Sequence, residues 1–331
     1  MANRAASILV LGIYAVFTTL GNAGTCSDVA RLEQTAEAMG TTYTVELCGT
    51  NQPVLQTAAR EAFDEVHRLD RMLSNYIPGS ELSRVNDHAA DAPVHVSQEF
   101  FDLLSQCVNY SNESEGTFDI TVGPLMKVWG FYEGAGHLAN AAEIRAALNE
   151  SGYHNLELNA ANLTVRFRKH GMALDPGGVG KGYAVDRMIA ILRKRGTCSG
   201  LVSAGGSSIY GIGAPPADAR GWRIRIRDPR NGNRTVSQVY LKDTSISTSG
   251  SSEKFFWAGD KRYSHIMDPR TGYPAEGMLS VSVVAPQTLD SEVWAKPYYI
   301  LGRAWTEQHK PPKFRVFMCE DKPNAPCGWL P

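Results

Sequence analysis

One short loop concentrates side chains that can take part in chemistry. Within residues 265–272 the sequence holds an imidazole, a carboxylate, a guanidinium and a hydroxyl, from His265, Asp268, Arg270 and Thr271. Turn dipeptides in this stretch indicate a tight polar loop, and loops held by rigid elements often carry functional sites. The ordinary pKa of histidine lies near neutral pH, so His265 is a candidate base or proton shuttle. An Asx-type turn with surface charges is the alternative explanation.

A second candidate site is the most glycine-dense stretch of the chain, residues 173–186. Glycines surround Lys181 at positions 177, 178, 180 and 182, where a helix is expected to begin. Backbone N–H groups and the positive end of a helix attract an anion, so the stretch predicts a phosphate cradle. Its spacing matches neither the Walker A motif nor the dinucleotide fingerprint. A glycine-rich turn with a solvated lysine is therefore the alternative.

Three further side chains are candidates for contact with a ligand. Asp119 lies among apolar neighbours, where a carboxylate needs a partner. That partner is either an amine or hydroxyl of a ligand or the backbone of a turn that Asp119 caps. Tyr76 precedes a Pro-Gly turn and could stack on a flat ring, and Met39 could pack on an aromatic ligand. Ordinary packing is the alternative for both.

Hydrophobic periodicity predicts the elements that position these residues. We expect helices over residues 56–73, 98–111, 141–151, about 180–195 and, despite Pro297, 291–303. We expect strands over residues 39–47, 200–203, 223–227, 238–241 and 280–285, and a hairpin over 156–168. Ser80 is expected to cap a short helix that ends near Asn86, and residues 311–326 read as an irregular tail.

Composition describes an ordinary globular protein. The chain has 331 residues, 43% of them hydrophobic and 20% charged, which is enough for a large core. The formal net charge is -1 and the sequence has no long basic run. Nucleic acid is therefore not expected as the main partner, because phosphate binding needs a concentrated basic face.

The first 23 residues have the pattern of a signal peptide. Arg4 precedes an apolar run over residues 5–20, and small residues end at Ala23, where we expect cleavage. The protein is then exported to the periplasm or cell envelope, and residues 24–331 form one domain. An uncleaved membrane anchor is the alternative.

An oxidising compartment would allow cysteines to pair. The chain has six cysteines and no Cys-x-x-Cys spacing, which gives no support to a zinc or thioredoxin-like site. Cys319 and Cys327 enclose a short proline-rich loop and could form a disulfide, and Cys26 and Cys48 flank the expected mature N-terminus.

Seven stretches taken together resemble the ApbE-like flavin transferases, the FAD:protein FMN transferases. They are Met39-Gly40-Thr41, residues 74–86, 117–125 and 174–186, Ala204-Gly205-Gly206, Thr248-Ser249-Gly250, and residues 265–274. Each motif is modest alone, but their joint presence in this order is specific, and the resemblance covers about residues 34–302. It implies an α+β fold of antiparallel sheets and packed helices, in two closely associated lobes with an FAD cleft between them.

The resemblance also implies an activity. The family moves FMN from FAD to a threonine or serine hydroxyl of an acceptor flavoprotein, with release of AMP, and uses magnesium at the pyrophosphate. Some relatives instead hydrolyse FAD to FMN and AMP. The expected partners are FAD and an acceptor flavoprotein, with membrane redox complexes as one setting in which such an acceptor occurs.

The resemblance assigns roles to the candidate residues. The rings of FAD would contact Met39, Tyr76, Phe118 and Asp119, while Lys181 and the glycine-rich backbone would hold phosphate or adenosine. Asp186 would orient the glycine-rich loop or contact FAD. Asp268 is expected to be catalytic together with His265. Asp268 and Thr271 would orient His265 and FAD, with Ser249 nearby.

The metal site is where this chain departs from the family pattern. Family members carry Ala-Asp-Ala-x-x-Thr-Ala before a Leu-Gly pair, and the Asp and Thr ligate magnesium together with a backbone group at the position of Gly178. Counted back from Leu301-Gly302 without gaps, Glu292 takes the Asp place and Lys296 the Thr place. Glutamate can ligate magnesium, but a protonated lysine cannot. A second register uses Asp290 as the ligand and needs a two-residue insertion.

Two functions remain open at this point. An FMN transferase is the first. The alternative is an FAD-binding carrier or electron-transfer protein, or an FAD pyrophosphatase, with little transfer activity because Lys296 replaces the threonine. We also expect the ammonium of Lys296 to occupy or adjoin the metal position.

Overall fold

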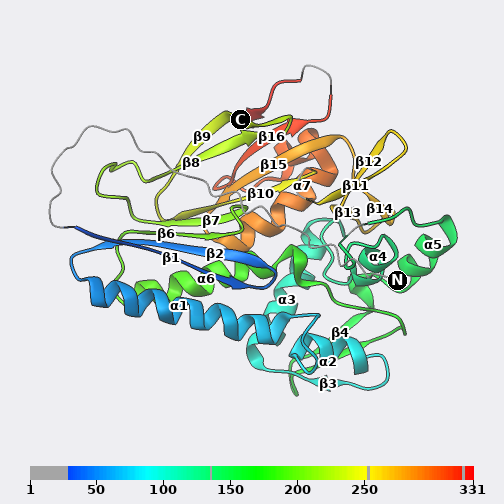
Figure 1. Ribbon diagram of the computed structural model, residues 1–331. Helices are drawn as coiled ribbons and strands as arrows, with labels where there is room; N and C mark the ends of the chain where they lie inside the picture. Colours follow the sequence, from blue (N-terminus) through cyan, green and yellow to red (C-terminus); the bar gives the residue numbers. More distant parts are fainter. Residues whose placement is uncertain (1–28, 135, 252–253, 323–324) are drawn as a thin grey trace, which may run out of the picture.

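The computed structural model describes residues 29–134, 136–251, 254–322 and 325–331 (Figure 1). The predicted signal peptide and Cys26 lie outside these residues. Among the helices that are described, none combines the length and the apolar character needed to cross a membrane.

An antiparallel eight-stranded sheet forms the centre of the fold, in the order β1-β2-β6-β7-β10-β15-β16-β17. Its strands are β1 (Ala30–Ala38), β2 (Thr41–Gly49), β6 (Gly200–Ala204), β7 (Ser208–Ile212), β10 (Thr244–Gly250), β15 (Met278–Ala285), β16 (Arg315–Glu320) and β17 (Gly328–Trp329). The turn between β1 and β2 contains Met39 and Gly40, both with positive φ. Every residue of β15 is buried, which agrees with the position of this strand in the interior of the sheet.

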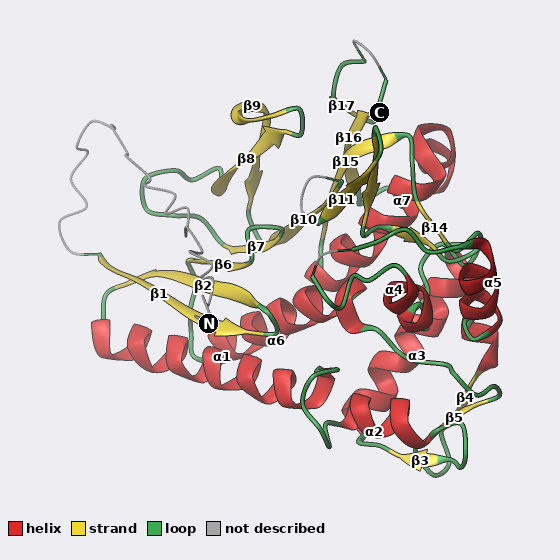
Figure 2. Cartoon of the chain, turned by 45° about the vertical axis from the view of Figure 1, so that its right-hand side comes forward, coloured by secondary structure: helices red, strands yellow, loops and turns green. Residues whose placement is uncertain are grey.

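Seven α-helices accompany the sheet in the described part of the chain. They are α1 (Gln52–Leu73), α2 (Glu81–His88), α3 (Gln98–Glu113), α4 (Gly123–Val128), α5 (Ala141–Asn149), α6 (Gly180–Lys194) and α7 (Thr288–His309). In Figure 2, α1 runs along the sheet below β1 and β2, with α6 beside it. Asn51 caps α1, and its apolar residues recur every three or four positions, so one face of the helix is buried.

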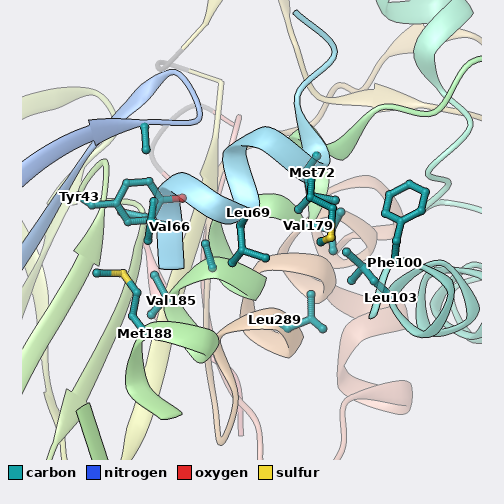
Figure 3. Packing of buried hydrophobic residues seen from close by; sticks show 14 of the residues in the cluster. Tyr43, Val66, Leu69, Met72, Phe100, Leu103, Val179, Val185, Met188 and Leu289 are labelled. Carbon is teal, nitrogen blue, oxygen red and sulfur yellow. The ribbon is translucent and has the colours of Figure 1, made fainter. Parts of the chain in front are cut away.

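Helix α7 joins two hydrophobic cores. Leu289 and Val293 belong to the larger core between the sheet, α1, α3 and α6, part of which is shown in Figure 3. Trp294, which directly follows Val293, and Tyr298 belong to a second core against β15 and β16. Burial of one such large side chain contributes roughly 1.5–3 kcal/mol. Residues between these positions on α7, including Glu292 and Lys296, are thus held rigidly at the junction of the cores.

Four small sheets complete the fold of the residues that the structure describes. Their strands are β3 (Val94–His95), β4 (Leu156–Asn159) and β5 (Thr164–Phe167); β8 (Trp222–Asp228) and β9 (Asn231–Leu241); β11 (Phe255–Ala258) and β12 (Lys261–Ser264); and β13 (Met267–Asp268) and β14 (Tyr273–Pro274). The β11–β12 hairpin leads directly into His265 and so positions the polar loop.

The predicted α+β class with antiparallel sheets is confirmed, as are the main helices and the 156–168 hairpin. Ser80 caps α2, although that helix continues to His88 rather than ending near Asn86. The prediction of an irregular tail was wrong for β16, which pairs with β15. The predicted Cys319–Cys327 disulfide is present. Helix α7 passes Pro297 and breaks at Gly302, where φ is 78°.

Candidate active site

The glycine-rich stretch starts α6, as predicted, and is held against two other elements. A Cβ on Gly180 would lie 2.9 Å from the Cε atom of Met39, in the β1–β2 turn. A Cβ on Gly182 would lie 2.6 Å from the carbonyl oxygen of Thr288, at the start of α7. Gly182 is therefore required by close approach, because a side chain there would push the backbone of α7 away, whereas at Gly180 the flexible end of Met39 could move aside.

Lys181 connects the two glycine-rich segments. Its ammonium donates a hydrogen bond to the hydroxyl of Ser207, at 2.7 Å. Ser207 directly follows Gly205 and Gly206, which both have positive φ in the turn between β6 and β7. The start of α6, the β6–β7 turn and the β1–β2 turn thus meet at one place, although the sequence separates them widely.

The acidic residues of α7 point in different directions. An oxygen of the buried Glu292 carboxylate accepts a hydrogen bond from the backbone N–H of Gly182, in the first turn of α6. Asp290 instead accepts a hydrogen bond at 2.6 Å from the hydroxyl of Tyr110, on α3. Glu292 is therefore the acidic residue at the glycine-rich stretch. This geometry favours the ungapped register, in which Lys296 stands at the usual threonine place.

Lys296 lies against the same stretch. Its ammonium donates hydrogen bonds to the carbonyl oxygens of Gly178, at 3.0 Å, and of Glu292, at 2.9 Å. A Cβ on Gly178 would lie 3.3 Å from Cε of Lys296 and 3.2 Å from the ring of Phe118. The absence of a side chain at Gly178 is what allows the lysine and the phenylalanine to converge.

The donor set at this place does not fit a magnesium ion. The expected ligands are a backbone group of Gly178, a carboxylate and a hydroxyl, yet the Gly178 carbonyl accepts from an ammonium and Glu292 accepts from Gly182. An ammonium within hydrogen-bond distance of the carbonyl repels a divalent cation. Within the described ranges, no group of three or more His, Cys, Asp or Glu side chains is placed to hold a metal ion.

His265 is a partly buried imidazole with one fixed nitrogen. Its Nδ1 lies 3.1 Å from the carbonyl oxygen of Lys254, which can only accept, so Nδ1 carries the hydrogen and the neutral ring keeps a lone pair on Nε2. Burial lowers the pKa of His265 from 6.5 to about 4, against the opposing effect of this hydrogen bond. The positive charges of Lys254, Lys296 and Lys181 contribute, after burial, to this same lowering of the pKa. The surroundings of His265 are therefore cationic and suit an anion.

Comparison with known proteins identifies the family. The model of the ApbE family matches residues 39–315, which is most of the chain. The chain belongs to the ApbE family. It is 30% identical to the FAD:protein FMN transferase of Treponema pallidum, over 84% of this chain and 82% of that protein. It is also 30% identical to the enzyme of the same name from Salmonella typhimurium, over 84% and 80%.

Solved structures of the ApbE family share the fold. The ApbE protein of Thermotoga maritima is similar with a TM-score of 0.81 at 28% identity, over 88% of this chain and 95% of that one. The apo form of the flavinyl transferase ApbE of Pseudomonas stutzeri also has a TM-score of 0.81, at 27% identity, over 93% and 96%. The resemblance inferred from seven short motifs is thereby confirmed.

The Asp268 carboxylate of this ApbE-family site has a partner that the sequence did not predict. Asp268 was expected to orient His265, but its carboxylate accepts hydrogen bonds from the guanidinium of Arg270, at 3.0 and 2.9 Å. The carbonyl of Lys254 orients the imidazole instead. Arg270 follows Asp268 by two residues in the same turn. This short separation places its guanidinium within hydrogen-bond distance of the Asp268 carboxylate. A catalytic role for Asp268 stays a prediction.

Two acidic residues are satisfied within the protein. Asp119 is buried and accepts hydrogen bonds from Thr121 and from the backbone N–H of Tyr153, at 2.7–2.8 Å. Burial raises its pKa in spite of these bonds. These contacts match the turn-cap alternative, and a contact of Asp119 with FAD stays a prediction. Asp186 accepts from the backbone N–H groups of Thr288 and Leu289, so it fixes the start of α7 relative to α6.

The remaining predicted residues lie in different surroundings. Tyr76 is 74% exposed, which leaves its ring able to stack on a ligand. Thr271 is exposed, and its hydroxyl bonds within its own turn. Ser249 is two residues beyond Ser247 on β10 and therefore on the face where Ser247 bonds to α7. Their roles in FAD binding stay predictions.

Sequence reasoning missed two residues of the site. Lys254 holds His265 through its carbonyl oxygen, a backbone contact that no side-chain pattern signals. Ser207 holds Lys181, and its position directly after Gly205-Gly206 was an available clue.

Proposed function

We propose that this chain is an exported FAD:protein FMN transferase. It moves FMN from FAD to a threonine or serine hydroxyl of an acceptor flavoprotein and releases AMP. Membership of the ApbE family and the printed names of its relatives support the reaction class. The observation that carries the proposal is the meeting of Lys181 and Lys296 at the glycine-rich start of α6, because two ammonium groups and a positive helix end can bind an anion there, with His265 as the proton acceptor.

The cationic surroundings suit the diphosphate of FAD. Lys181, Lys254 and Lys296 act together on the imidazole, and Lys181 lies in the first turn of α6, where the helix end is also positive. Phosphoryl transfer needs neutralisation of the charge that builds up on the phosphate oxygens. In this proposal the lysines and the helix end provide it.

His265 serves as the general base of the transfer. The hydroxyl oxygen of the acceptor attacks the phosphorus on the FMN side of the diphosphate, and its proton passes to Nε2 of His265. The bond between that phosphorus and the bridging oxygen breaks, and AMP leaves with the bonding electrons. Because burial keeps the imidazole neutral at physiological pH, it is ready to accept the proton before FAD binds.

Export rests on two observations. The pattern of residues 1–23 is that of a signal peptide. The Cys319–Cys327 disulfide, at the end of the central sheet, is typical of proteins in an oxidising compartment. The acceptor flavoprotein is then a protein that meets this chain in the periplasm or cell envelope, including subunits of membrane redox complexes.

Lys296 supports two alternatives to transfer, which are FAD binding alone and FAD hydrolysis. One experiment separates transfer, hydrolysis and binding. The mature protein is incubated with FAD and an acceptor flavoprotein, and AMP, free FMN and covalent FMN are measured. The proposal predicts AMP and covalent FMN in equal amounts. Free FMN with AMP identifies a pyrophosphatase, and bound FAD without AMP identifies a carrier.

A further inference from the structure

Lys296 lies where the glycine-rich stretch meets α7. Its ammonium bonds to the Gly178 carbonyl at 3.0 Å and to its own helix through the Glu292 carbonyl at 2.9 Å. The stem of the side chain packs beside Gly178 and close to Phe118. The two cores that α7 joins fix the backbone of this helix on both sides of Lys296. The position of the positive charge is thus built into the fold.

The groups that would hold a divalent cation here are engaged in protein contacts. The carboxylate of Glu292 is buried and accepts from the backbone N–H of Gly182. Turning it toward a cation would leave that N–H without an acceptor in a buried place, which is costly. A cation at the Gly178 carbonyl would also stand beside the ammonium of Lys296.

The same place is nevertheless suited to a diphosphate. Lys296 is one of three lysines whose charges act on His265, with Lys181 and Lys254 as the others. Lys181 is fixed by Ser207 in the first turn of α6. Three cations and a helix N-terminus offer more positive charge than the two negative charges of a diphosphate require.

We propose that Lys296 is the built-in cation of a metal-independent diphosphate site, so that this chain binds FAD without magnesium. The inference rests on the proposed function, because FAD is the ligand that brings the diphosphate. It deepens that function by stating that the lysine of α7 supplies the charge that a metal ion supplies in the family pattern.

The test measures binding rather than turnover. FAD is titrated into the mature protein, with flavin fluorescence as the signal, once in EDTA and once in excess magnesium. We expect dissociation constants that agree within about twofold. A tenfold or larger loss of affinity in EDTA, reversed by magnesium, would overturn the inference.

Variants of Lys296 test whether its positive charge is what replaces the metal ion. Lys296→Thr restores the usual threonine, and we expect it to bind FAD roughly tenfold or more weakly in EDTA, because it removes a charged hydrogen-bond donor. Magnesium should recover part of this loss. Lys296→Arg keeps the charge and should remain independent of metal. Lys169→Thr, at an exposed lysine on another part of the surface, is the matched control and should behave as wild type.

Circular dichroism of each variant confirms folding, and calorimetric titration of the FAD complexes with magnesium gives a second readout. We expect no heat of magnesium binding for wild type and a measurable one for Lys296→Thr. Stoichiometric magnesium binding by the wild-type complex would contradict the inference while leaving the proposed function intact. Failure of the wild type to bind FAD in either buffer would contradict the proposed function itself.

Discussion

The carboxylate of Asp186 accepts a hydrogen bond from the backbone N–H of Leu289, with 2.8 Å between the two atoms. Its other oxygen accepts from the N–H of Thr288, also at 2.8 Å. One side chain of α6 therefore satisfies two N–H groups at the start of α7, 102 and 103 residues further along the chain. This cap sets the position from which α7 carries Glu292 and Lys296 into the site.

Asp186→Ala is expected to destabilise the protein by about 1–3 kcal/mol, because it leaves two N–H groups without acceptors at a largely buried helix end. Asp186→Asn retains one acceptor oxygen and should lose less. Urea unfolding monitored by circular dichroism measures both. Asp260→Ala removes an exposed carboxylate and serves as the control. Equal stability of Asp186→Ala and wild type would show that the cap does not hold the two helices together.

Gly182→Ala is expected to cost about 1–3 kcal/mol, because the added Cβ would lie 2.6 Å from the Thr288 carbonyl oxygen and 2.9 Å from the Glu292 carboxylate. The helices α6 and α7 would have to separate. Gly232→Ala, in β9, meets nothing within 4 Å and should change the free energy of unfolding by less than about 0.5 kcal/mol. Similar effects of the two substitutions would argue against the close approach of α6 and α7.

The low pKa of His265 should make the stability of the protein depend on pH. Below pH 6.5 the unfolded chain gains a proton on this histidine that the folded chain gains only near pH 4. His265 therefore reduces stability progressively as pH falls from 6.5 toward 4. His265→Asn should lose less stability over that range than wild type, in urea unfolding at each pH.

NMR titration reports the same group directly, with His265→Asn used to assign its signal. In the FAD-free protein we expect the imidazole to titrate near pH 4. Bound FAD should raise the pKa, since its diphosphate brings negative charge beside the lysines. An ordinary titration near pH 6.5, unchanged by FAD, would place His265 outside the cationic site.

Reduction of the Cys319–Cys327 disulfide should lower stability. The two cysteines are eight residues apart, and closing so short a loop in the unfolded chain is worth roughly 2.5 kcal/mol. Cys327→Ser or dithiothreitol should therefore lower the melting temperature, whereas Cys198→Ser, at an exposed free cysteine, should not. A native protein whose two cysteines both react with a thiol reagent before any reduction would remove one of the two supports for export.

The sequence predicted the interior elements better than the edges. Helix α1 has apolar residues at helical spacing and strand β15 consists mainly of apolar residues, and both elements were expected. Strand β1 was missed because it pairs only with β2 at the edge of the sheet, and its exposed positions are polar. Strand β16 was missed because neighbouring prolines suggested an irregular tail.

The candidate site was predictable in its residues but not in its contacts. The order of the motifs identified Lys181, His265 and Lys296 as candidates for one site, because each lies in or beside a stretch that resembles the family. Whether Asp268 would bind His265 or Arg270 depends on side-chain geometry within one turn, which no spacing encodes. The choice between Asp290 and Glu292 likewise depended on which face of α7 meets the glycine-rich stretch.

The measurement closest to the central claim is transfer of FMN to an acceptor flavoprotein followed by mass spectrometry of the acceptor. The mature protein, FAD and an acceptor with a single threonine or serine flavinylation site are incubated, beside an acceptor in which that residue is alanine. We predict one covalent FMN on the hydroxyl-bearing acceptor, none on the alanine variant, and loss of the product with His265→Asn. An acceptor that stays unmodified while FAD is bound or hydrolysed would contradict the account.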